Sequence, residues 1–387
     1  MARIFLILIF CISQLAADEP APKKQTVCLN MIVKNEKGVI RRCLDSVKPL
    51  IDYWVIVDTG SDDGTQEIIK KHMKGIPGEL HERPWRNFGE NRSEAYNLAR
   101  GKGDYILFMD ADDTLDYEKG FRFKNLTKDC YNMWRGIETL SYIKPQLVKG
   151  DLRWKWVGVT HEYLGCDKYF TSETLKGVFY TTREGGADSL VPKKKFHRDI
   201  KLLTAGLKTE PKNDRYMFYL AESYRFADEK GKAIEWYQKR VNAGGWDEEI
   251  FWSKLQIAQL LSDLDLPKSI VIEAYKNAHA YRPHRMEPVY YLSELYNSQG
   301  QHSKAYELVK AQAFIPKPAE KDSLFNMDWI EQYGLLFQLS ISAYYVGNYQ
   351  ESLDACKKLL QMKNLPEEWR NQAEINRSYP LARLEKK

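Results

Sequence analysis

The residues best suited to chemistry form one acidic segment, Asp110-Ala111-Asp112-Asp113. It ends the apolar stretch Asp104–Asp110, which predicts a buried β-strand that carries Asp110 at its tip. Asp112 follows two residues later. Two carboxylates placed in this way can hold one divalent cation against a diphosphate, because hard oxygen ligands suit Mg²⁺ and Mn²⁺. The sequence therefore predicts a Mn²⁺ or Mg²⁺ site at Asp110 and Asp112.

The same spacing of aspartates occurs a second time, in Asp263-Leu264-Asp265. No strand pattern precedes this copy, and helical patterns lie on both sides of it. It is expected to be a solvated turn. The spacing alone is therefore not specific, and the preceding strand is what distinguishes the first copy.

The elements that would position the acidic segment alternate between strand and helix. Strands are predicted at Thr26–Lys34, Tyr53–Asp58, Glu79–Glu82 and Asp104–Asp110, and helices at Lys37–Val47, Gly64–Met73 and Gly89–Arg100. This alternation indicates parallel βαβ units and hence an α/β fold, in which ligands bind beyond the carboxyl ends of the strands. Two strands end in aspartate, Asp58 and Asp110, so chemistry is expected there.

From about Lys201 the chain becomes helical, rich in tyrosine and repetitive. A large-small-x-x-aromatic pattern occurs at Leu220–Tyr224 and again at Leu292–Tyr296, and an alanine follows each tyrosine nine residues later. Small residues let paired helices approach closely, and this pattern resembles the tetratricopeptide repeat. An ordinary helical bundle is the alternative interpretation.

Four motifs in a fixed order carry a second resemblance. They are Asn30–Glu36 (NMIVKNE), Val57–Thr65 (VDTGSDDGT), Asn91-Arg92 and Asp110–Asp113 (DADD). This order resembles family 2 glycosyltransferases of the GT-A fold, over about Thr26–Tyr117 and more weakly to Asp199. Together with Trp156–Leu164 and the repeats, it resembles a subgroup with tetratricopeptide-like tails. The resemblance implies an α/β GT-A (Rossmann-like) nucleotide-sugar-binding domain at 26–200 and an all-α tetratricopeptide-like repeat domain at 201–387.

The resemblance implies nucleotide-sugar-binding roles for Glu36, Asp58, Arg92, Asp110 and Ala111. Asp58 would accept the N3–H of a uracil base. Glu36 would either touch the nucleoside or cap the helix that follows it, and both roles stay open. Arg92 would hold the base or the pyrophosphate bidentately, with a salt bridge to Glu94 or to the aspartate cluster as the alternative.

The remaining candidates concern the metal and the catalytic base. His161 is a candidate third metal ligand, because neutral imidazole suits Mn²⁺, and a satisfied buried histidine is the alternative. Glu162 is a candidate general base for the acceptor hydroxyl, and Asp188 is its rival. Adjacent side chains point apart in a strand, so His161 and Glu162 need not face the same site.

The predicted activity is metal-dependent, inverting sugar transfer of the hexosyltransferase type. The resemblance implies a nucleoside-diphosphate sugar donor, UDP-linked, and a glycan, protein or lipid acceptor. The repeat domain would hold the acceptor or a partner protein. A repeat scaffold with a degenerate transferase domain is the alternative. A nucleotidyltransferase is disfavoured, because Val33–Glu36 stands where a Gly-rich, Arg-containing loop is expected.

Composition and the N-terminus limit partners and location. The 58 basic and 53 acidic residues give a net charge of only +5, which does not suggest nucleic acid. The apolar run Ile4–Ile12 and the small residues Ala16 and Ala17 predict a cleaved signal peptide at 1–17, followed by a linker at 18–25. The expected location is the ER or Golgi lumen, or otherwise extracytoplasmic. An uncleaved anchor with a cytosolic catalytic domain is the alternative.

Overall fold

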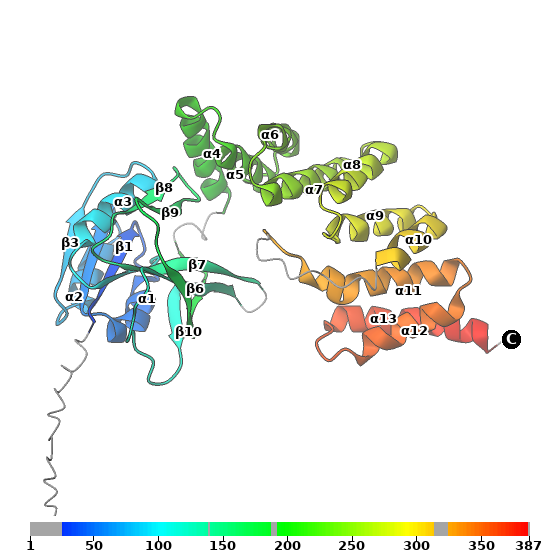
Figure 1. Ribbon diagram of the computed structural model, residues 1–387, viewed down its shortest axis with the longest axis horizontal. Helices are drawn as coiled ribbons and strands as arrows, with labels where there is room; N and C mark the ends of the chain where they lie inside the picture. Colours follow the sequence, from blue (N-terminus) through cyan, green and yellow to red (C-terminus); the bar gives the residue numbers. More distant parts are fainter. Residues whose placement is uncertain (1–24, 138–139, 187–191, 313–323, 386–387) are drawn as a thin grey trace, which may run out of the picture. The chain divides into compact units, whose positions relative to one another are not determined.

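The computed structural model describes residues 25–137, 140–186, 192–312 and 324–385. The chain divides into two compact units (Figure 1). The first contains residues up to 157 and 162–190, and the second contains 158–161 and the residues from 191 onwards. The predicted signal peptide and Asp188 lie outside the described residues. Within the described ranges, no helix is long and apolar enough to cross a membrane.

The parallel half of the first unit confirms the predicted α/β pattern. Its strands are β1 (Val27–Val33), β2 (Tyr53–Asp58), β3 (Gly78–Glu82) and β4 (Tyr105–Phe108), and they lie in the order β3-β2-β1-β4. β1 pairs in parallel with both β2 and β4, and β2 pairs in parallel with β3. β4 ends two residues before Asp110, so Asp110 lies in the turn that follows the strand and not in the strand itself.

Helices pack on both faces of these strands. They are α1 (Ile40–Val47), α2 (Thr65–His72) and α3 (Phe88–Ala99). Side chains of α1 and α2 share a buried cluster with Leu29 and Met31 of β1, whereas Tyr96 and Ala99 of α3 pack with Cys28. Successive strand residues point to opposite faces, so α3 covers the face opposite to α1 and α2. Both faces are therefore buried, as expected for parallel strands.

The other half of the sheet was not predicted from the sequence. β7 (Leu140–Lys149) pairs antiparallel with β4, and β6 (Cys130–Ile137) pairs antiparallel with β7. β10 (Ser172–Thr181) pairs in parallel with β6. β5 (Thr114–Tyr117) pairs antiparallel with β10 and forms the edge of the eight-stranded sheet. A separate hairpin joins β8 (Trp154–Val157) and β9 (Tyr163–Cys166). Segments far apart in sequence thus meet beside β4.

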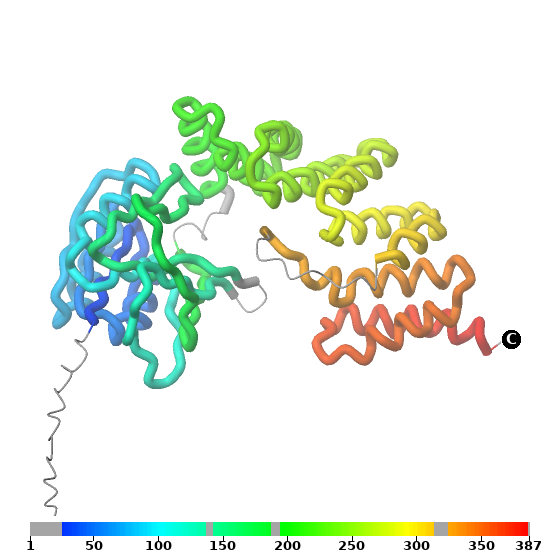
Figure 2. The backbone as a smooth tube through the Cα atoms, in the orientation of Figure 1, coloured from blue at the N-terminus to red at the C-terminus, as the bar shows by residue number. Residues whose placement is uncertain are grey.

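The second unit is a stack of antiparallel helices (Figure 2). The helices are α4 (Pro192–Thr209), α5 (Asp214–Phe226), α6 (Lys230–Ala243), α7 (Asp247–Asp263), α8 (Lys268–Tyr281), α9 (Glu287–Ser298), α10 (His302–Gln312), α11 (Leu335–Tyr345), α12 (Tyr349–Gln361) and α13 (Glu367–Leu384), with a π-helical turn η2 (Ile330–Gly334) before α11. Ala221 and Ser293, the small residues of the two repeat patterns, are both buried, as those patterns predict.

The helical unit also contains the second aspartate pair and the predicted domain boundary. Asp265, in the second aspartate pair, lies in an exposed turn between α7 and α8, as predicted. The unit begins earlier than the predicted position 201, because α4 starts at Pro192 and packs against α5.

Candidate active site

Asp58 ends β2 and is fully buried. Its Oδ1 accepts the backbone N–H groups of Gly60, at 2.9 Å, and Ser61, at 2.8 Å. Gly60 has φ +106°, a conformation that glycine adopts readily and that closes this turn. The second oxygen, Oδ2, is buried and has no hydrogen-bond partner among the described residues. A buried carboxylate oxygen without a donor is costly in a protein interior, so a ligand N–H is the partner that this position suits.

The loops after β1 and β2 are tied to each other by hydrogen bonds. The backbone N–H of Glu36 donates to Thr65 Oγ1 at 2.9 Å, and the N–H of Asp62 donates to Asn35 Oδ1 at 2.9 Å. Glu36 accepts two backbone N–H groups at the start of α1 through its carbonyl oxygen, and the N-cap position of α1 makes no side-chain cap bond. Glu36 thus lies beside the Asp58 turn, with its side chain half-buried.

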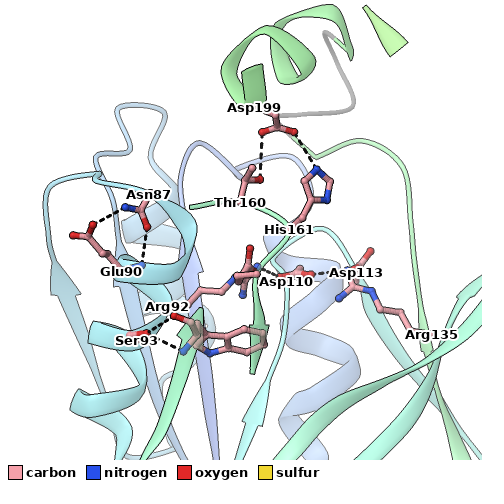
Figure 3. Close-up of polar contacts among 12 residues, drawn as sticks. Asn87, Glu90, Arg92, Ser93, Asp110, Asp113, Arg135, Thr160, His161 and Asp199 are labelled. Atoms are coloured by element: carbon pink, nitrogen blue, oxygen red, sulfur yellow. Dashed lines mark hydrogen bonds and ion pairs between the residues drawn. The ribbon is translucent and has the colours of Figure 1, made fainter. Parts of the chain in front are cut away.

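Two arginines hold the carboxylate of Asp110 (Figure 3). Arg92 on α3 donates from Nη2 to Oδ1 at 2.5 Å, and Arg135 on β6 donates from Nη2 to Oδ2 at 2.6 Å. The same Arg135 nitrogen lies 2.9 Å from Asp113 Oδ2. The backbone N–H of Asp110 donates to the Tyr180 hydroxyl at 2.6 Å, and the Arg135 guanidinium lies 4.4 Å from the centre of the Tyr180 ring. Groups from α3 and β6 therefore hold the side chain of Asp110, and a group from β10 holds its backbone.

The arrangement shifts the pKa values of the acidic segment in opposite directions. Burial raises the pKa of Asp110, but the charges of Arg92, Arg135 and Lys144 outweigh it and hold that pKa well below its usual range. Burial, followed by the charge of Asp110, raises the pKa of Asp113 to about 7. Asp110 is therefore ionised at neutral pH, whereas Asp113 changes its protonation state near neutral pH.

Glu162 and His161 are neighbours in sequence, but they have different surroundings. Glu162 Oε1 lies 2.7 Å from Arg92 Nε, so Glu162 belongs to the same ionic cluster as Asp110. His161 has φ +51° and stacks on Tyr219 of α5, with the ring centres 4.1 Å apart. Its Nε2 lies 3.7 Å from Asp199 on α4. These contacts of His161 are all made within the helical unit, which includes residues 158–161.

The predicted metal-binding residues can be assessed from their donor chemistry. The half-buried carboxylate of Asp112 and the remaining lone pairs of Asp110 are hard oxygen donors that suit Mn²⁺ or Mg²⁺. Gly186 packs against Asp112 so closely that a Cβ there would lie 2.3 Å from Asp112 Oδ2. Among the described residues, no group of three or more His, Cys, Asp or Glu side chains could hold a metal. Asp110 and Asp112 therefore have the donor chemistry that such a cation takes, and a bound diphosphate or water would have to complete its ligands.

Several residues of the site could not be identified from the sequence. Arg135, Lys144 and Tyr180 come from β6, β7 and β10, and no motif marks them. Ala111, which was predicted at the nucleotide-sugar site, is buried between the two aspartates. Asp188, the rival candidate base, lies outside the described residues.

Comparison with known proteins supports the motif-based interpretation. Residues 28–120 match the family model described as Glycosyl transferase family 2. The chain is 24% identical over 249 residues to the SPbeta prophage-derived glycosyltransferase SunS of Bacillus subtilis, over 60% of this chain and 57% of SunS. It is 38% identical over 92 residues to a TPR repeat-containing protein of Synechococcus elongatus, over 24% of this chain and 22% of that protein. The solved structure of YrrB, described as a TPR protein with an unusual peptide-binding site, aligns with a TM-score of 0.35 at 12% identity, over 49% of this chain and 88% of YrrB.

Residues 28–120 of the α/β unit therefore match the family 2 glycosyltransferase model, as the ordered motifs predicted. The helical unit that follows has the tetratricopeptide-like architecture that the repeat pattern predicted. The chain spans little more than half the length of SunS.

Proposed function

We propose that this protein is a glycosyltransferase that moves a sugar from a nucleoside-diphosphate sugar, UDP-linked, to a hydroxyl group of an acceptor. The observation that carries the proposal is the pair of aspartates beyond the parallel strands. Asp58 presents a buried carboxylate oxygen without a partner, and Asp110 is held rigidly as an anion beside Asp112. The family 2 match of residues 28–120 supports the same chemistry.

Each end of the donor would meet a different aspartate. The Oδ2 atom of Asp58 would accept the N3–H of uracil, which satisfies the buried oxygen. Arg92 and Arg135 would keep the Asp110 carboxylate in one orientation, so that no side-chain ordering is required when the donor binds. Glu162 would orient Arg92 through its ion pair. This division would give separate roles to Asp58, at the end of β2, and to Asp110, in the turn after β4.

The expected cofactor is Mn²⁺ or Mg²⁺, held by Asp110 and Asp112. When bound, it would neutralise the charge that develops on the departing diphosphate. The ring of His161 stacks within the helical unit, so His161 as a third ligand stays a prediction that rests on the sequence alone. The same holds for Glu162 or Asp188 as the base that takes the acceptor proton. Attack from the face opposite to the diphosphate would invert the anomeric configuration.

The acceptor and the location are further parts of the proposal. A glycan, protein or lipid hydroxyl would be the acceptor, and the helical unit would hold either the acceptor or a protein partner, because stacked helix pairs present extended binding surfaces. The apolar run Ile4–Ile12 supports entry into the secretory pathway, with a cytosolic orientation behind an uncleaved anchor as the alternative.

A ligand-binding panel tests the donor class. Thermal unfolding of the full chain would be followed with UDP-, GDP- and CMP-linked sugars, each with Mn²⁺ and with EDTA. The proposal expects an increase in the melting temperature with UDP-linked sugars, because a ligand that binds only the folded state stabilises it. Asp58→Asn should reduce the increase, because it weakens binding of the base. The absence of a shift with every nucleotide sugar would contradict the proposal and favour a scaffold with a degenerate transferase domain.

A further inference from the structure

Lys144 lies on the same face of the β6–β7 hairpin as Arg135. In the antiparallel register, Lys144 is opposite Met133, and Arg135 is opposite Tyr142. Residues two apart along a strand point to the same side, so Lys144, Tyr142, Met133 and Arg135 share one face. Since Arg135 reaches Asp110 from this face, the ammonium of Lys144 approaches the acidic cluster from the same direction.

Contacts and charges confirm this placement. The Lys144 Nζ lies 5.6 Å from the centre of the Trp156 ring, and the guanidinium of Arg92 lies 5.5 Å from the centre of the same ring. The charges of Asp110 and Glu162 both act on Lys144. Lys144 is therefore part of the cluster that holds Asp110.

Lys144 differs from the two arginines of the cluster in having no hydrogen-bond or ion-pair partner among the described residues. Arg92 and Arg135 each contact two carboxylates, whereas no hydrogen bond or ion pair joins Lys144 to any residue that the structure describes. Burial, followed by the charge of Arg135, lowers the pKa of Lys144 to about 8. An ammonium group that is partly desolvated and has no ion pair costs stability, and a bound anion would offset this cost.

Trp156 provides an independent indication of an acceptor-rich ligand at the same place. Its ring is buried, at 3% exposure, and its indole N–H has no hydrogen-bond acceptor among the described residues. Lysine and an indole N–H are both donors only, so they would be satisfied by a group that carries several acceptor oxygens. A diphosphate has this chemistry, and a neutral acceptor hydroxyl does not.

We propose that Lys144 is a diphosphate-binding residue, which contacts the phosphate oxygens of the nucleotide-sugar donor and of the nucleoside diphosphate that leaves. This inference rests on the proposed function, since it takes its ligand from that donor. The β6–β7 hairpin lies outside the family match at residues 28–120. The proposal gives this hairpin a direct part in donor recognition.

The test compares UDP with uridine, which lacks the phosphates. Dissociation constants would be measured by calorimetry with the full chain and Mn²⁺, for the wild type, Lys144→Met and Lys144→Arg. We expect Lys144→Met to weaken UDP binding about tenfold or more and to change uridine binding less than about twofold. Lys144→Arg should keep UDP binding within about threefold of the wild type, because it preserves the charge.

A matched control is available on the neighbouring hairpin. Lys155 on β8 is exposed and lies between the buried Trp154 and Trp156, so Lys155→Met removes the same charge on the opposite side of the strand. It should leave both affinities unchanged. Equal losses for UDP and uridine in Lys144→Met, or no loss for either, would overturn the assignment of Lys144. Absence of UDP binding by the wild type would instead refute the proposed function, so the two failures are distinguishable.

Discussion

Replacing Lys144 with methionine should stabilise the protein at neutral pH although it weakens the donor site. A fall in the pKa of Lys144 from its usual 10.5 to about 8 corresponds to roughly 3 kcal/mol, which is the cost of keeping the charged ammonium in the folded site. Lys144 is only partly buried, so solvent screening reduces this cost, and about 1–2 kcal/mol is the expected gain in the free energy of unfolding. Methionine retains most of the aliphatic length of lysine and can fill the same space.

The difference in stability between Lys144→Met and the wild type should depend on pH. Below pH 8, Lys144 is protonated in both the folded and the unfolded states, so the full cost of burying its charge is present. Between pH 8 and 10.5 the unfolded state binds more protons than the folded state, so the wild type gains stability as the pH rises. The advantage of Lys144→Met over the wild type should therefore be largest at pH 7 and disappear towards pH 10.5.

Urea unfolding followed by tryptophan fluorescence at pH 7, 8, 9 and 10 would measure this difference, with Lys155→Met as the control for loss of a surface charge. A destabilised Lys144→Met at pH 7 would refute the reasoning, because it would mean that Lys144 has a stabilising partner in the folded protein. A gain that does not change with pH would show that packing, and not the buried charge, is responsible.

Three other substitutions test the site. Asp110→Asn should lower the free energy of unfolding at pH 7 by about 2–3 kcal/mol, because it leaves Arg92 and Arg135 without their shared carboxylate. The deficit should shrink as the pH falls below the usual pKa of an aspartate, because the unfolded wild type then takes up a proton that the folded wild type does not. Urea unfolding at pH 7 and pH 3 measures both effects, and equal stability at pH 7 would contradict the two-arginine arrangement. Gly186→Ala should reduce turnover more than Gly231→Ala, because a Cβ at Gly186 would meet Asp112 at 2.3 Å whereas one at Gly231 on α6 would meet nothing within 4 Å; equal rates of UDP release from the two variants would contradict this. Asp58→Asn should weaken UDP and uridine binding by the same factor, about tenfold, in contrast to Lys144→Met, and calorimetry with both ligands would expose any selective loss.

The parts of the site that lie at strand ends could be predicted from the sequence. The buried strands before Asp58 and Asp110 have unbroken apolar runs, and the rule that ligands lie beyond the carboxyl ends of parallel strands then selects these two residues. Arg92 was also placed correctly on the helix before β4, because α3 has a regular helical pattern. Its salt bridge with the aspartate cluster, one of the two roles left open, is present in the structure.

The remaining part of the site depends on long-range pairing. Arg135 and Lys144 reach the cluster only because β7 pairs with β4 and β6 pairs with β7, and the register of those pairs decides which side chains face Asp110. A shift of one residue would turn both away, and residue types alone do not fix the register. The surroundings of His161 were equally hidden, since its ring is directed by a left-handed backbone conformation and by a stacking partner more than fifty residues away on α5.

We propose that the acidic segment supports cleavage of a nucleotide sugar. The most direct measurement is the release of UDP from UDP-linked sugars by the full chain with Mn²⁺, for the wild type and for Asp112→Asn, which alters a half-buried carboxylate. We expect the wild type to release UDP and Asp112→Asn to release it at least about a hundredfold more slowly, with little change in the melting temperature. Equal rates of release by the two proteins, or no release from any UDP-linked sugar by the wild type, would contradict it.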